Sequence, residues 1–202
     1  MHTVLKPKIM YFGTPVVLIS TLNEDGSANL APMSSAWWLG DSCVLGLGQS
    51  GKTAENILRT GECVLNLPSS EMVSVVDKLA LTTGKTPVPD FKAKMGYKYI
   101  KDKLGLASLT PVNSEMVGPP RVLECPVQLE AKLEKYSQLG ESGKFAYAIE
   151  VNIIRMHIEE NLLSEERRHY VDTDKWRPLI MSFCEFYDLG NNVHPSRLAK
   201  VF

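Results

Sequence analysis

NLAPMSSAWWLGDSCVLGLGQSGKTAEN, the segment Asn29–Asn56, contains the pattern that decides the predicted fold. Within it, the apolar run Ser42–Gly48 has the length and composition of a β-strand, and the residues after it favour a short helix. The first N–H groups of a helix lack intrahelical partners and lie at the positive end of its dipole. Together with the side chains of Ser50, Lys52 and Thr53, this helix start predicts an anion site that suits a phosphate group.

This phosphate site has a second interpretation, as the P-loop of a nucleoside triphosphatase. Residues 46–53 match the pattern G-x-x-x-x-G-K-T and would stand between a strand and a helix, as that motif requires. P-loop enzymes also need parallel βαβ units and an aspartate on a later strand to hold magnesium. The next apolar segment, Cys63–Pro68, has no aspartate, so we keep this interpretation only as the weaker alternative.

Extended segments on both sides of this region favour antiparallel pairing. Thr14–Thr21 and Ser27–Met33 flank the turn signal Asn23–Gly26, which predicts a hairpin. Further along the chain, Cys125–Glu134 and Phe145–Ile153 alternate apolar and polar residues. Because the helices interrupt these strands in no βαβ order, we predict a mainly β fold, a closed antiparallel barrel with helices packed outside it.

Two helices are expected in the first half of the chain. Thr53 can cap the first helix, and Gly61 stands just after its predicted end. A second amphipathic helix is predicted from Ser69 or Ser70 to about Leu81.

Length and composition predict one folded unit. The chain has 202 residues, of which 44% are hydrophobic and 22% charged, and these values are ordinary for a globular domain with a substantial core. We expect a single domain over residues 1–202. It would carry a long loop excursion over about 82–121, rich in Gly and Pro, and a packed C-terminal tail over about 172–202.

Charge and composition argue against several classes of partner. The formal net charge of -1 comes without a basic stripe for nucleic acid, and no apolar run approaches the ~20 residues of a membrane span. The four histidines form no pair at metal-ligand spacing, so we predict no metal site. The lack of a signal-peptide or membrane-spanning run leads us to expect a cytoplasmic protein. The cysteines are widely spaced, which indicates reduced core thiols. They are Cys43, Cys63, Cys125 and Cys184.

Several motifs occur in an order that resembles the flavin reductase-like FMN-binding split-barrel family, of the flavoredoxin type. The resemblance covers most of the chain and implies a Greek-key-like antiparallel split barrel. Its motifs are TPVVLISTLNEDGSANLAPMSS (residues 14–35), KTxxNI with TGE and VLNLP (52–68), ECPVQLEAKLEK (124–135), AIEVNIIRMHIEENLL (148–163) and HPSRLA (194–199).

The resemblance also implies where FMN would lie. The family runs the segment Asn29–Ser35 beside the flavin ring and ribityl chain, and its small and hydroxyl residues suit close contact with a flat ligand. Asn56 is added because it lies three residues after Thr53 on the same helical face. The expected cofactor-binding residues are Asn29, Ala31, Pro32, Met33, Ser34, Ser35, Ser50, Lys52, Thr53 and Asn56.

As a family member, the protein would be a homodimeric flavin oxidoreductase that passes hydride from NADH or NADPH to flavin N5. The cofactor carries this chemistry, so we predict no catalytic side chain. An FMN-binding electron carrier without nicotinamide activity stays open, because no residue separates the two. Trp37 and Trp38 favour core or interface packing over flavin stacking, and neither His157 nor His194 is given a role.

Overall fold

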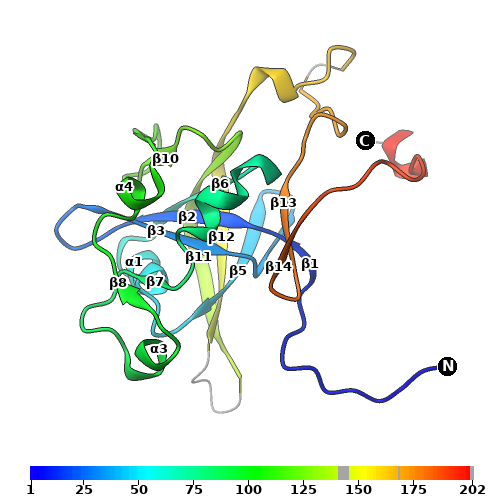
Figure 1. Ribbon diagram of the computed structural model, residues 1–202. Helices are drawn as coiled ribbons and strands as arrows, with labels where there is room; N and C mark the ends of the chain where they lie inside the picture. The colour runs from blue at the N-terminus through cyan, green and yellow to red at the C-terminus, as the bar shows by residue number, and fades with distance from the viewer. Residues whose placement is uncertain (141–145, 168, 201–202) are drawn as a thin grey trace.

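The computed structural model describes residues 1–140, 146–167 and 169–200. Its centre is a seven-stranded sheet that curls into a split barrel (Figure 1), with the strand order β3-β2-β6-β11-β12-β5-β4. Every neighbouring pair in this sheet is antiparallel, which confirms the predicted fold class and differs from the parallel units of P-loop enzymes. The strands are β2 (Val17–Leu22), β3 (Ala28–Met33), β4 (Ala36–Leu39), β5 (Ser42–Gly48), β6 (Glu62–Leu67), β11 (Val127–Leu139) and β12 (Ala146–Ile158).

Helix α1 (Lys52–Thr60) closes one end of the barrel. It connects the end of β5 to the start of β6, and its buried residues Ala54 and Ile57 join the apolar cluster inside the barrel. The helix stops at Gly61, whose left-handed φ of 72° lets its N–H bond to the carbonyl of Ile57. The glycine after the helix is therefore at the position that the sequence predicted.

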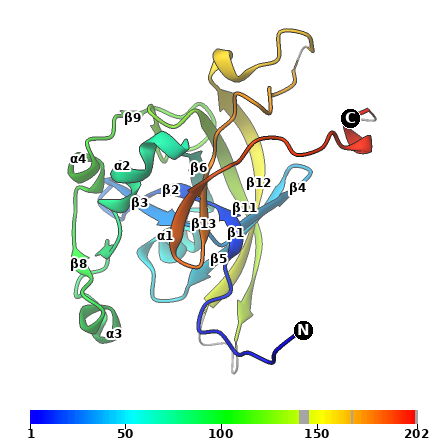
Figure 2. The same cartoon turned by 45° about the vertical axis from the view of Figure 1, so that its right-hand side comes forward.

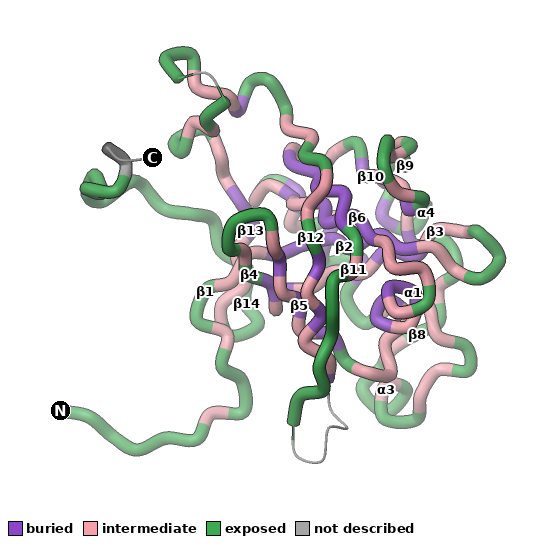
Figure 3. Tube along the Cα trace, turned by 180° about the vertical axis from the view of Figure 1, so that it is seen from behind, coloured by how far each residue is buried: buried purple, intermediate pink, exposed green. Residues whose placement is uncertain are grey.

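A second apolar cluster lies on the other face of the β2–β3 hairpin. Leu18 and Leu30 point to this side, where α2 (Val73–Asp77), α4 (Lys103–Ala107) and β13 (Leu179–Ser182) contribute buried residues. In Figure 3 the buried residues are concentrated in the central strands and α1. Because alternate residues of a strand face opposite sides of the sheet, β2 serves both clusters.

The excursion predicted over about 82–121 contains short elements rather than one irregular loop. They lie beside the barrel, and α4 reaches the edge of β3 (Figure 1). The elements are β7 (Thr82–Thr83), α3 (Asp90–Lys94), β8 (Lys98–Tyr99), α4, β9 (Pro111–Val112) and β10 (Arg121–Val122).

The second helix predicted from the sequence is wrong in its length. The chain forms a 3₁₀ turn, η1 (Ser70–Met72), followed by α2, which ends at Asp77. Leu81 has a φ of 54°, outside the right-handed helical region. Val76 is still buried, as its apolar spacing predicted. It lies on a short helix with turns on either side.

The hairpin β11–β12 is longer than the alternation in the sequence predicted. Both strands continue past the barrel core. There the residues of β11 from Glu134 onward are exposed, so no alternation of apolar and polar residues marks this part of the strand in the sequence. Phe145, which the sequence placed on the inner face, lies outside the described residues.

Strands near the two ends of the chain pair with each other beside the barrel. Strand β1 (Phe12–Pro15) pairs with β13, and β13 pairs with β14 (Glu185–Asp188). Before β13, the chain passes through the 3₁₀ turn η3 (Glu160–Leu162), and near its end it forms η4 (Arg197–Lys200). Residues 189–198 are exposed, and both termini extend away from the barrel in Figure 2.

Candidate functional site

Helix α1 starts without a side-chain cap. Gly51 is its N-cap, with an extended backbone (φ -82°, ψ 139°), and Thr53 is already the second helical residue rather than the predicted cap. The N–H of Gly51 donates to the carbonyl of Gly48 at 2.9 Å, which closes the turn that contains Ser50. The first N–H groups of α1 therefore have no capping side chain, and this is the condition in which helix starts bind anions.

A buried network of amides and hydroxyls joins α1 to the β2–β3 hairpin. Nδ2 of Asn29 donates to the hydroxyl oxygens of Thr21 and Thr53, each at 3.1 Å. Nδ2 of Asn56 donates to Thr21 at 3.1 Å and to Oδ1 of Asn23 at 3.0 Å. The structure thus brings Asn29, Thr53 and Asn56 together, but the amide N–H groups of both asparagines are used within the protein.

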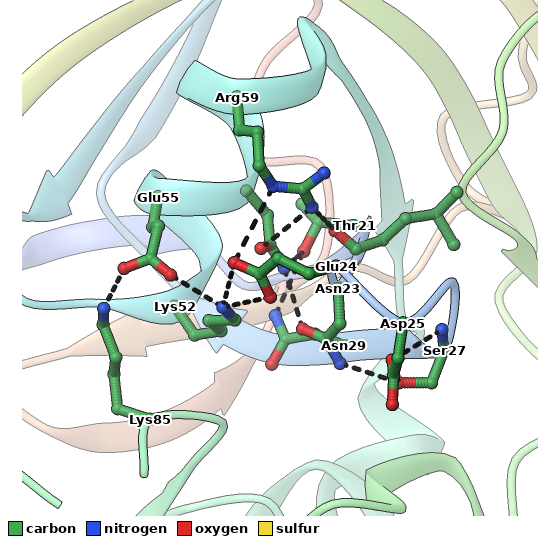
Figure 4. Close-up of polar contacts among 12 residues, drawn as sticks. Thr21, Asn23, Glu24, Asp25, Ser27, Asn29, Lys52, Glu55, Arg59 and Lys85 are labelled. Atoms are coloured by element: carbon green, nitrogen blue, oxygen red, sulfur yellow. Dashed lines mark hydrogen bonds and ion pairs between the residues drawn. The ribbon is translucent and has the colours of Figure 1, made fainter. Parts of the chain in front are cut away.

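Lys52 is held between two carboxylates at the start of α1 (Figure 4). Its Nζ lies 2.7 Å from Oε2 of Glu24 and 2.7 Å from Oε1 of Glu55, and Lys85 also pairs with Glu55. The hydrogen bond from Lys52 is the main cause that lowers the pKa of Glu24. Lys52 was predicted to face a phosphate, but the hairpin turn brings Glu24 to it, and two carboxylates share its charge.

Lys103 is a buried cation that sequence analysis missed. Its residue is only 3% exposed, and Nζ donates to Oδ1 of Asn29 at 3.3 Å. Among the described residues, no carboxylate lies within ion-pair distance of it. Burial lowers the pKa of Lys103 to about 8, and the nearby charge of Lys92 contributes in the same direction. No local pattern could have found Lys103, because it lies in the excursion, 74 residues from Asn29.

The predicted flavin segment continues along an edge of the sheet. Pro32 fits in β3 because an edge strand has one side without ladder hydrogen bonds. The carbonyl of Ser35 accepts from the N–H of Gly46 at 2.7 Å, and a Cβ on Gly46 would stand 2.9 Å from that of Ser35. Gly46 therefore allows the backbone of this segment to lie directly against β5.

The predicted site residues fall into two groups. Asn29, Ser50, Lys52, Thr53 and Asn56 gather at the α1 end of the barrel. Pro32, Met33 and Ser34 line a cavity of about 140 Å³ near the other end of β3, and Ala31 lies between the groups, opposite Ile19 in β2. A strand rises about 3.3 Å per residue, so Asn29 and Met33 of β3 lie roughly 13 Å apart.

Comparison with known proteins shows to which family this chain belongs. A model of the flavin reductase like domain matches residues 9–180. The chain belongs to the flavin reductase-like family. Its relative YdfE of Bacillus subtilis (strain 168), an uncharacterized protein, is 40% identical over 189 residues, which cover 94% of this chain and 90% of YdfE.

Solved structures share the fold of this flavin reductase-like protein. Flavoredoxin of Desulfovibrio vulgaris (Miyazaki F) superposes with a TM-score of 0.79 at 22% identity, over 99% of this chain and 100% of flavoredoxin. Nitrilotriacetate monooxygenase component B from Bacillus cereus gives a TM-score of 0.73 at 20% identity, over 93% and 89% of the two chains. The resemblance inferred from the sequence motifs is therefore confirmed.

Family membership gives this flavin reductase-like protein a flavin-related oxidoreductase function. Among the described residues, no helix is long and apolar enough to cross a membrane. Within the same residues, no three His, Cys, Asp or Glu side chains gather as a metal site. The groups that the structure does assemble are the helix start, the amide–hydroxyl network and the lysines around them.

Proposed function

We propose that this protein binds FMN, with the phosphate at the start of α1 and the flavin ring along Ala31–Ser35, and that it oxidises NADH or NADPH. The observation that carries the proposal is the uncapped start of α1 beside the Asn29–Thr53 hydrogen bond. This end of β3 suits an anion, and the strand leads from it to the Ser34–Ser35 backbone. Membership of the flavin reductase-like family supports the flavin.

The residues at the α1 end fit a phosphate group. The helix-start N–H groups and the hydroxyls of Ser50 and Thr53 can donate hydrogen bonds to its oxygens. Lys52 and Lys103 flank this region, and only Lys103 is without a carboxylate partner among the described residues. Because an unpaired buried cation is costly, a bound anion close to Lys103 would stabilise it. We therefore add Lys103 to the proposed phosphate site.

Bound FMN would supply the two-electron chemistry, accepting hydride from a reduced nicotinamide. The chain's own residues would bind and orient it. Ser34 is 9% exposed and Ser35 is tied to Gly46, so the backbone beside the proposed ring position is held in place. We propose no side chain as acid, base or nucleophile.

We also propose that the protein is a cytoplasmic homodimer. Segments that extend from the barrel (Figure 2) carry exposed apolar side chains, and covering these side chains would favour association. All four cysteines are free thiols, which suits a reducing compartment. The exposed residues in question are Val4, Leu5, Met10, Tyr136 and Leu139.

An anaerobic visible spectrum tests the proposed activity. The desalted protein, loaded with FMN if necessary, should show flavin bands, and these should bleach with NADH or NADPH faster than free FMN does under the same conditions. Addition of oxidised NAD as a control should leave the bands unchanged. Bands that survive both reduced nicotinamides would favour the electron-carrier alternative. A protein that takes up no FMN would contradict the proposal as a whole.

A further inference from the structure

Strand β1 brings Tyr11 to the end of the proposed flavin segment. β1 pairs with β13 and also contacts β4, the strand that begins directly after Ser35. Tyr11 is the residue before β1, and its hydroxyl oxygen lies 3.1 Å from Oγ of Ser35. The two residues are 24 positions apart in the sequence, so it is the fold that brings their hydroxyl groups together.

The backbone of Tyr11 is held by the turn between β13 and β14. Its carbonyl oxygen accepts a hydrogen bond from the N–H of Phe183 at 2.8 Å, and the hydroxyl of Ser182 donates to the same oxygen at 3.4 Å. The rings of Phe12 and Phe183 pack edge to face with their centroids 4.8 Å apart. Figure 2 shows β1 beside β13. Tyr11 is therefore fixed in position by groups other than its hydroxyl.

The hydroxyl of Ser35 has a proton that the protein does not use. Among the described residues, Tyr11 is its one hydrogen-bond partner. A phenol is a stronger acid than an aliphatic hydroxyl, so Tyr11 donates this bond and Oγ of Ser35 accepts it. The backbone of Ser35 is tied to Gly46, whose N–H donates to its carbonyl at 2.7 Å. Ser35 thus presents a free donor from a fixed position.

We propose that Tyr11 is a positioning residue that holds the hydroxyl of Ser35 ready to donate a hydrogen bond to the flavin ring. This inference rests on the proposed function, in which the ring lies along Ala31–Ser35. Carbonyl oxygens and ring nitrogens at the edge of a flavin can accept such a bond. The bond from Tyr11 keeps χ1 of Ser35 in one of three staggered positions, so less side-chain freedom is lost when the flavin binds.

A double-mutant cycle tests this role in the full-length protein, with the affinities of FMN and riboflavin measured by fluorescence titration. Tyr11→Phe removes only the hydroxyl and should weaken the binding of both flavins about threefold, the weight of one staggered position among three. Ser35→Ala should weaken both about threefold to tenfold, the range of one neutral hydrogen bond. Adding Tyr11→Phe to Ser35→Ala should cause no further loss, because both residues act through one hydroxyl. The preference for FMN over riboflavin should stay the same in every variant, since the phosphate is not affected.

Tyr187→Phe is the matched control, because Tyr187 lies on β14 of the same sheet and is 54% exposed. It should bind both flavins as the wild type does. The proposal is overturned if Tyr11→Phe or Ser35→Ala binds both flavins with wild-type affinity. A further loss on adding Tyr11→Phe to Ser35→Ala also overturns it, because Tyr11 would then act through packing alone. In these cases flavin binding by the wild type leaves the proposed function intact, whereas a wild type that binds neither flavin contradicts both.

Discussion

At the scale of single residues, the two lysines of the proposed phosphate site differ in what surrounds them. Lys52 is the one that the sequence points to, but two carboxylates share its charge. Lys103 is buried against the amide of Asn29 with no carboxylate at ion-pair distance among the described residues. A charged group that is desolvated without a counter-ion lowers the free energy of unfolding, and the size of this loss changes with pH.

Replacing Lys103 by Met should change the pH dependence of stability. The pKa of Lys103 is about 8 in the fold against 10.5 when unperturbed. Between these values the unfolded chain binds more protons, so the free energy of unfolding of the wild type should rise with pH relative to Lys103→Met. The relative gain should reach about 2 kcal/mol between pH 7.5 and pH 9.5. Urea unfolding at a series of pH values measures it.

The exposed Lys98 supplies the control for this experiment. The free energy of unfolding of Lys98→Met should show the same pH dependence as that of the wild type over the whole pH range. Parallel curves for Lys103→Met as well would show that Lys103 is not desolvated, and the case for including it in the phosphate site would be lost.

At the scale of elements, one buried carboxylate fastens the excursion to the barrel. Glu130 of β11 is fully buried and accepts hydrogen bonds from the N–H groups of Glu115 at 2.9 Å and Met116 at 2.6 Å. Nε2 of His157 on β12 lies 2.7 Å from the same carboxylate. Burial raises the pKa of Glu130, but these hydrogen bonds more than offset it, so the pKa is lowered overall. The stabilisation is thus present above about pH 4.5 and is lost as the pH falls.

Glu130→Gln should loosen the excursion at neutral pH. A carboxamide has one acceptor oxygen where the carboxylate has two, so one of the two amide N–H groups loses its partner. We expect a loss of about 1–3 kcal/mol in stability and faster hydrogen exchange at Glu115 and Met116. Glu134→Gln, an exposed change on the same strand, should alter neither. Unchanged exchange at both amides in Glu130→Gln would mean that other contacts hold the excursion.

The elements that sequence analysis predicted well are those with a local signal. The apolar run of β5, the turn between β2 and β3, and the glycine after α1 each determine a neighbouring structure through short-range rules. The excursion has no such signal, since β7 and β8 pair over two residues each. The role of Lys103 depends on a contact 74 residues away, and the partners of Lys52 depend on where the hairpin turn lies in three dimensions.

At the scale of the whole molecule, the barrel has two different ends. One is closed by α1 and gathers the helix start, the amide–hydroxyl network and the lysines. The other is lined by apolar side chains around a cavity of about 580 Å³. The β3 strand runs between these ends, so a flavin that is held by its phosphate at α1 would direct its ring towards Ser34 and Ser35. The central claim is therefore that the α1 end recognises a phosphate.

The most direct measurement of that claim compares the affinities of FMN and riboflavin, which differ by the phosphate alone, for the wild type, Thr53→Val and Thr60→Val. The wild type should bind FMN at least about tenfold more tightly than riboflavin, as one or two charge-assisted hydrogen bonds would give. Thr53→Val, at the start of α1, should reduce that preference several-fold, and Thr60→Val, at the other end of the helix, should leave it unchanged. Equal affinities of the wild type for FMN and riboflavin would contradict the account.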